Sequence, residues 1–225
     1  TEGVGSAATY PFGRGGFEVS KLEEATVKRY LPAAELSKLK STTASNPQCE
    51  YARKLFLFSY YCYGISFIDM AMLTTAHIKQ MEDGDYIVYK RQKIKRQKGV
   101  KPISIKITPA IRQLIGSLQA ASPTVDDFLL PVVTRSGYTG ERLYMHIRTR
   151  YSKYQKYLRL LAEELGIDFH LTSYVSRHTA AMTLQRNNIP REVISQMLGH
   201  ADLETTNVYL DSFDNGVINE AAKVL

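Results

Sequence analysis

The sequence predicts a mainly α-helical fold with a small antiparallel β-sheet, a fold of the α+β class. Three observations support this prediction. The apolar stretch 55–73 is interrupted at Gly64, as two buried helices joined by a turn would be. Residues 145–165 repeat Tyr and Leu at helical spacing, while the segments DYIVYKRQ and KPISIKIT alternate apolar and polar residues as paired strands do.

The first helices follow in order from Pro32. One helix is predicted over Pro32–Lys40 and a pair of helices over Cys49–Leu73, divided at Gly64. The apolar part of that pair approaches membrane-spanning length, but Asp69 lies within it. Because an acid in hydrocarbon is costly, core helices are favoured and no membrane partner is expected.

A basic run, KRQKIKRQKGVK at 90–101, separates the two alternating segments. It holds seven Lys or Arg and no acid, so the other 22 basic residues equal the 22 acidic ones and the net charge of +7 resides here. The pattern predicts a two-stranded hairpin whose charged tip lies in solvent. Such a concentration of positive charge, with a pI near 9.3, favours a polyanionic partner.

The next two helices follow the hairpin. Pro109 is suited to the first position of a helix that extends from Thr108 to about Leu118. The Tyr and Leu stripe of 145–165 is interpreted as a core face beside a solvated basic face. A DNA-facing surface, on which basic residues alternate with tyrosines, is the alternative interpretation of this helix.

Three further helices are predicted toward the C-terminus. Each has residues suited to its start or its end. The expected capping residues are, in chain order, Thr172 or Ser173 and Asn187-Asn188 for the first helix, Pro190 and Gly199 for the second, and Asp202 for the last, which carries Tyr209.

The rest of the composition limits the class of protein. Residues 1–30 begin rich in Gly, Ala and Ser without the features of a secretory signal, so we interpret them as a linker from an N-terminal domain to a domain at 31–225. Cys49 and Cys62 are too few for a disulfide framework and lack metal-ligand spacing with His. A reducing intracellular setting without a metal site is therefore favoured.

Three features stand in a fixed order near the C-terminus: Y-x-x-R at 174–177, L-G-H at 198–200, and Tyr209. The first and last residues of Y-x-x-R share a helix face, and a tight turn after the glycine can bring His200 back toward it. Taken singly, each feature is equally well a surface ion-pair residue, a packing histidine or one of fifteen tyrosines. Their joint order is therefore more informative than any one of them.

This order resembles the C-terminal catalytic half of the tyrosine recombinases, the phage integrase family, which carries H-x-x-R, L-G-H and a nucleophilic Tyr. The first core helices and the strand lysine of that family are matched by 55–73 and Lys93, so the likeness covers most of the chain. The resemblance implies the family's DNA breaking-rejoining fold, with Tyr209 as the covalent nucleophile and Arg177 as a fork on the phosphate oxygens. It implies that His200 donates to the phosphate or manages the Tyr proton, and that Lys93 protonates the departing 5′ oxygen.

Two positions depart from the family pattern. Ser66 stands where the family has the first Arg of G-[LM]-R-x-x-E, as in the G-x-S-x-x-D form of some integrases of bacterial mobile elements. Tyr174 replaces the His of H-x-x-R and can donate one hydrogen bond from the same catalytic position. We hypothesise that another arginine supplies the missing charge, with Arg53 as the first candidate and Arg91 as the second.

The resemblance implies a site-specific recombinase or integrase that cleaves and rejoins duplex DNA through a 3′-phosphotyrosyl intermediate, without a metal or nucleotide cofactor. The alternative is a DNA-binding relative with impaired catalysis, acting as a regulator or architectural protein. Expected partners are double-stranded DNA, further copies of the chain in a tetramer on DNA, and accessory DNA-bending proteins, at the nucleoid in bacterial cytoplasm. The expected DNA-binding residues are Lys90, Arg91, Lys95, Arg96, Lys98 and Lys101.

Overall fold

A computed structural model describes residues 30–96, 98–200, 206, 207 and 210. The predicted linker up to residue 29, Asp202 and Tyr209 therefore lie outside the described residues. The helices are α1 (Ala33–Ser41), α2 (Pro47–Tyr61), α3 (Phe67–Ala71), α4 (Pro109–Ala121), α5 (Gly140–Glu164), α6 (Val175–Arg186) and α7 (Arg191–Leu198), with a 3₁₀ turn η3 at Thr75–His77. The strands are β1 (Ile78–Met81), β2 (Gly84–Tyr89) and β3 (Ile103–Lys106). The mainly helical fold with a small antiparallel sheet confirms the predicted class.

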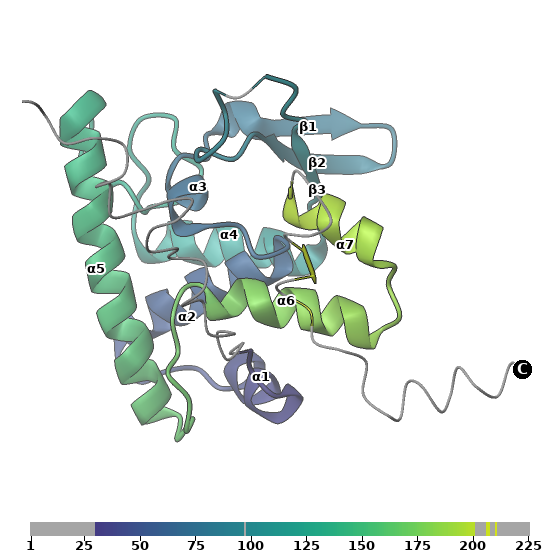
Figure 1. The fold of residues 1–225 in the computed structure, drawn as a ribbon. Helices are drawn as coiled ribbons and strands as arrows, with labels where there is room; N and C mark the ends of the chain where they lie inside the picture. The colour runs from purple at the N-terminus through teal and green to yellow at the C-terminus, as the bar shows by residue number, and fades with distance from the viewer. Residues whose placement is uncertain (1–29, 97, 201–205, 208–209, 211–225) are drawn as a thin grey trace, which may run out of the picture.

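Helix α2 is the centre of the molecule. It packs against α4, α5 and α6, and its Leu55, Phe56 and Phe58 are fully buried. Figure 1 shows α5 along one side of the molecule, the sheet at the top above α7, and α1 at the bottom. The predicted break at Gly64 separates α2 from α3, so the end of α2 turns directly toward α6.

The sheet has one strand more than the predicted hairpin. Strands β1, β2 and β3 pair antiparallel in that order, with Ile78 opposite Ile87 and Tyr89 opposite Ile103. Strand β1, with the sequence IKQM, was missed because it is an edge strand whose residues are mostly exposed and do not alternate in polarity. Strand β2 also ends earlier than predicted, so the basic run forms turns between β2 and β3.

Helix α5 buries the predicted apolar stripe. Tyr154, Leu158 and Leu161 are each 4% exposed or less, and Phe67 of α3 stacks on Tyr154 with ring centroids 5.1 Å apart. The core interpretation of this helix is therefore confirmed. Tyr151 is an exception at 38% exposed, because it lies at the edge of the stripe.

The predicted start of α6 is wrong. The residue before the helix is Tyr174, without a side-chain cap, and neither Thr172 nor Ser173 caps it. Ser173 instead binds α5, with its N–H donating to Gln155 at 2.8 Å and its hydroxyl 3.2 Å from that of Tyr151.

The other predicted ends of α6 and α7 agree with the structure to within one residue. Asn187 ends α6, and Asn188 has the left-handed φ of 59°. Pro190 is the residue before α7, and Gly199 ends α7 with φ 64°. Among the described residues, no helix has the length and apolar character needed to cross a membrane.

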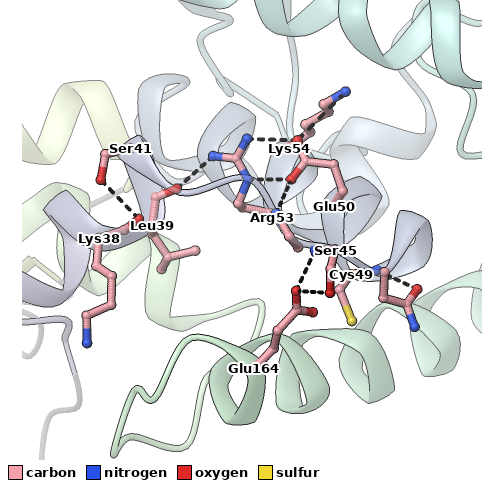
Figure 2. Close-up of polar contacts among 11 residues, drawn as sticks. Lys38, Leu39, Ser41, Ser45, Cys49, Glu50, Arg53, Lys54 and Glu164 are labelled. Atoms are coloured by element: carbon pink, nitrogen blue, oxygen red, sulfur yellow. Dashed lines mark hydrogen bonds and ion pairs between the residues drawn. The ribbon is translucent and has the colours of Figure 1, made fainter.

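Arg53 links two helices and does not lie near Ser66. This corrects the expectation that Arg53 is the first candidate for the missing positive charge. Figure 2 shows its guanidinium between two partners: Nε and Nη2 each lie 2.7 Å from a carboxylate oxygen of Glu50, and Nη1 donates to the Leu39 carbonyl at 2.7 Å. Because Leu39 lies near the end of α1, Arg53 ties α1 to α2. Eight residues, about 12 Å of helix, separate Arg53 from the end of α2 that faces α6.

Replacing Arg53 with Ala should destabilise the fold by about 2 kcal/mol, because the half-buried Glu50 carboxylate would lose its closest cation and keep only Lys54 at 3.8 Å and the N–H of Ala44. Urea unfolding at neutral pH measures this change. Arg159→Ala is the matched control, since the Arg159–Glu163 pair is exposed and 4.0 Å apart, and its loss should hardly change stability. Equal stability of the two variants would contradict the structural role of Arg53.

The same interaction should depend on pH. Burial opposes ionisation of Glu50, but hydrogen bonds from Arg53 and the N–H of Ala44 outweigh it, so the pKa of Glu50 is lowered from its ordinary value of 4.5. The pair therefore contributes its full stability above about pH 4.5, and this contribution is lost as the pH falls through the lowered pKa. The gap in stability between wild type and Arg53→Ala should narrow in acid.

Candidate active site

A buried arginine and a histidine from separate segments meet where α6 passes the end of α7. Arg177, in the first turn of α6, is 3% exposed. Its Nη1 donates to the Gly64 carbonyl at 3.1 Å and its Nη2 to the Leu198 carbonyl at 2.5 Å. The same Nη2 lies 2.8 Å from Nε2 of His200. The turn after α7 thus brings His200 to Arg177, as the spacing of the motifs predicted.

Two glycines permit this close approach. A Cβ on Gly64, which has φ +71°, would lie 2.4 Å from the Cα of Arg177, so the turn after α2 packs directly on the backbone of α6. A Cβ on Gly199, which has φ +64°, would lie 2.3 Å from Cδ1 of Ile103 in β3. Both positions require glycine, for its positive φ and for the lack of space.

Buried hydroxyls hold the same turn against α6. The hydroxyl oxygens of Ser59 in α2 and Ser176 in α6 lie 2.7 Å apart, and the Ser59 hydroxyl also lies 2.8 Å from the Ile65 carbonyl. Both serines are 1% exposed or less. A hydrogen bond in such a buried place is costly to break, so the Gly64 turn has one well-defined position beside Arg177.

Arg91 brings a second positive charge to this place. It lies half-buried in the connection between β2 and β3, and its Nη1 donates to the Gly199 carbonyl at 3.2 Å. Burial, together with the charge of Arg91, lowers the pKa of Arg177 to about 10, while Asp69 opposes this lowering. A bound anion would offset the repulsion between the two guanidinium groups.

Ser66 and Asp69 join α3 to the basic run. Ser66 is the N-cap of α3, and its hydroxyl lies 2.6 Å from Oδ2 of Asp69. Asp69 is 4% exposed, and its Oδ1 accepts from the N–H of Gln92 at 2.7 Å. Because Gln92 lies between Arg91 and Lys93, Asp69 fixes the backbone that carries both. The G-x-S-x-x-D motif contains Asp69, but nothing in its residue pattern indicated this role.

The other expected site residues surround this cluster. Lys93 is exposed in the turns after β2, not in the strand where it was predicted. Tyr174 is 51% exposed, and its ring lies edge-on to that of His178, with centroids 5.0 Å apart. Tyr209 lies outside the described residues. The exposed basic residues of this run besides Lys93 are Lys90, Lys95, Arg96, Lys98 and Lys101.

The sequence did not point to Thr206. This residue is fully buried, and its Oγ1 lies 2.7 Å from Nδ1 of His200. Thr206 stands three positions before Tyr209, in a polar segment that offers several hydroxyls, so only the structure singles it out. In the part of the chain that the structure describes, no three His, Cys, Asp or Glu side chains gather as metal ligands.

Comparison with known sequences gives one family over most of the chain. The model of the phage integrase family matches residues 29–215. Over 54 residues the chain is 41% identical to tyrosine recombinase XerD of Halalkalibacterium halodurans, which is 24% of this chain and 18% of that protein. Over 114 residues it is 31% identical to tyrosine recombinase XerC of Rhodospirillum centenum, which is 51% of this chain and 31% of that protein. The chain thus spans less than a third of the length of these relatives.

Solved structures share the fold. The crystal structure of XerA recombinase has a TM-score of 0.60 at 21% identity, covering 87% of this chain and 64% of that one. The Tn1549 transposon integrase in complex with transposon right end DNA has a TM-score of 0.59 at 13% identity, covering 92% and 70%. XerH recombinase bound to its difH substrate has a TM-score of 0.58 at 19% identity, covering 87% and 53%.

Gly64→Ala should destabilise the protein by roughly 2–4 kcal/mol, because the new methyl group meets the backbone of α6 at a positive φ. Thermal or urea unfolding measures the loss. Gly116→Ala is the control, since Gly116 is exposed within α4 with open space around it, and alanine should stabilise that helix by roughly 1 kcal/mol. A neutral Gly64→Ala would mean that α2 and α6 are not in direct contact there.

Proposed function

Because this chain belongs to the phage integrase family, whose model spans residues 29–215, we propose that it is a site-specific DNA recombinase. It cleaves and rejoins duplex DNA through a 3′-phosphotyrosyl intermediate. The observation that carries this proposal is the contact between the buried Arg177 and His200, 2.8 Å apart and next to the basic run. Buried cationic and hydrogen-bonding groups that converge on one point suit the charge of a phosphoryl-transfer transition state.

The chemistry assigns each residue one role. The Tyr209 oxygen attacks the phosphorus, a Tyr–phosphate bond forms, and the bond to the 5′ oxygen of the DNA breaks. Arg177 offsets the growing negative charge on the non-bridging oxygens, and His200 either donates to the same phosphate or takes up the Tyr proton. Lys93 protonates the departing 5′ oxygen, and Tyr174 adds one hydrogen-bond donor at the exposed edge. Rejoining reverses these steps.

Arg91 supplies the charge that Ser66 lacks. A serine hydroxyl carries no positive charge, and here it caps α3. Arg91 reaches the turn that carries His200, since it donates to the Gly199 carbonyl, and it acts electrostatically on Arg177. Arg53 has no such position, because Glu50 and the Leu39 carbonyl bind it at the other end of α2. The second candidate therefore takes the place of the first.

The exposed basic run is the surface that suits the DNA backbone. Its charge, concentrated between β2 and β3 beside the site, attracts phosphates without reading sequence. XerH and the Tn1549 integrase, which share the fold, were solved bound to DNA. For this chain we propose duplex DNA as substrate, a tetramer of copies on paired sites with accessory DNA-bending proteins, and action at the nucleoid of a bacterial cytoplasm.

A suicide substrate tests the proposed function. The protein, as the full chain, is incubated with a nicked version of its recombination site, and a denaturant-resistant protein–DNA adduct is expected. Tyr209→Phe should bind the same DNA and form no adduct, because it lacks the attacking oxygen. If wild type binds DNA without any adduct, the proposal fails and a DNA-binding regulator or architectural protein is the correct alternative.

Arg91→Ala should slow adduct formation by about 100-fold, the usual cost of a lost transition-state donor, with a much smaller loss of DNA affinity. Single-turnover cleavage and a DNA-binding titration measure the two effects. Arg96→Ala is the matched control, because it removes the same charge from an exposed position in the same run. Equal cleavage rates in the two variants would remove Arg91 from the active site.

A further inference from the structure

The ring of His200 is held at both nitrogens. Nε2 lies 2.8 Å from Nη2 of Arg177, and Nδ1 lies 2.7 Å from Oγ1 of Thr206. Arg177 and Thr206 are both buried, at 3% and 0% exposed. Such short contacts on two sides leave the imidazole one orientation between α6 and the segment before Tyr209.

The chemistry of the two partners determines which ring nitrogen of His200 carries the hydrogen. A guanidinium group has only donors, so Nε2 of His200 accepts from Arg177 and carries no hydrogen in this state. The proton of the neutral ring is then on Nδ1, where it is donated to the Thr206 oxygen. Thr206 can accept this bond because a hydroxyl oxygen has two lone pairs, and its own hydrogen is free to turn elsewhere.

We infer that Thr206 is a positioning residue that places the proton of His200 on Nδ1 and so makes Nε2 the proton acceptor for the nucleophile. This inference rests on the proposed function. It decides between the two roles open to His200, because a ring with its lone pair on Nε2 accepts a proton first and donates only afterwards. Tyr174 stands where the family has its other histidine, so His200 is the histidine of these motifs that can accept the proton.

Binding of DNA itself would release Nε2. The two hydrogens of the Arg177 Nη2 are used by the Leu198 carbonyl and by His200. A phosphate that takes the second hydrogen breaks the contact with His200 and brings a negative charge beside the ring. Among the described residues, the charged groups of this cluster are Arg177, which contacts His200, and Arg91 and Asp69, which act on Arg177. Two arginines disfavour an imidazolium, so the phosphate charge must be present before the ring takes a proton.

The proton then follows a closed path. As the Tyr209 oxygen bonds to phosphorus, its phenolic proton passes to Nε2 of His200, while Lys93 gives a proton to the departing 5′ oxygen. The resulting imidazolium keeps its Nδ1–H bond to Thr206 throughout, so the ring does not rotate. On rejoining, the 5′ hydroxyl attacks phosphorus and gives its proton back to Lys93, while Nε2 returns its proton to the Tyr oxygen as the Tyr–phosphate bond breaks.

Nitrogen NMR on protein with ¹⁵N-labelled histidine tests the placement of the proton. His200→Gln identifies the His200 signals, and wild type should show a protonated Nδ1 and an unprotonated Nε2. Thr206→Val, which keeps the shape and removes the oxygen, should shift the ring toward the Nε2–H form. Thr206→Ser, which keeps the oxygen, should restore the wild-type pattern. A wild-type ring with its proton on Nε2 would overturn the inference, whether or not Thr206→Val folds.

Cleavage of the suicide substrate tests the consequence. Thr206→Val should form adduct at least about tenfold more slowly than wild type at unchanged DNA affinity, and Thr206→Ser should recover most of the rate. A Thr206→Val protein with an altered tautomer and the wild-type rate would show that Nε2 is not the acceptor. Absence of adduct in wild type would instead refute the recombinase proposal, and the NMR result would still decide the role of Thr206.

Discussion

The direct contact between the Gly64 turn and the backbone of α6 is the constraint on which the site depends. Without a side chain at Gly64, its carbonyl reaches the guanidinium of Arg177, and the Leu198 carbonyl reaches it from the other side. Two fixed carbonyl dipoles thus hold a buried positive charge in a defined plane before any substrate arrives. Preorganisation of this kind lowers the reorganisation that a phosphate would otherwise have to drive.

The rest of the site is arranged around this buried cation. Arg91 adds charge to it, and Asp69 anchors the segment that carries Arg91 and Lys93. The site is therefore assembled from a helix pair, a strand connection and a turn, each fixed by a separate buried contact. For the proposed recombinase, such a division would keep the reacting groups in place while exposed basic residues adapt to the DNA backbone.

The sequence predicted what local sterics and periodicity determine. The helix breaks at Gly64 and Gly199 follow from glycine itself, and the meeting of Arg177 with His200 followed from their order. Contacts between residues distant in sequence were not predictable. Arg53 was expected to supply charge to the site, but it binds the Leu39 carbonyl, 14 residues away. Thr206 was missed for the same reason, because its partner is known only once the turn after α7 is formed.

The cap that Ser66 provides limits which residues this position can accept. An arginine grafted back at this position would lose the N-cap of α3 and the contact that orients Asp69, and it would place a third cation beside Arg177 and Arg91. A single Ser66→Arg substitution would therefore cost helix α3 its cap and add repulsion to this cluster. The serine at position 66 is thus tied to the fold through its cap and through Asp69.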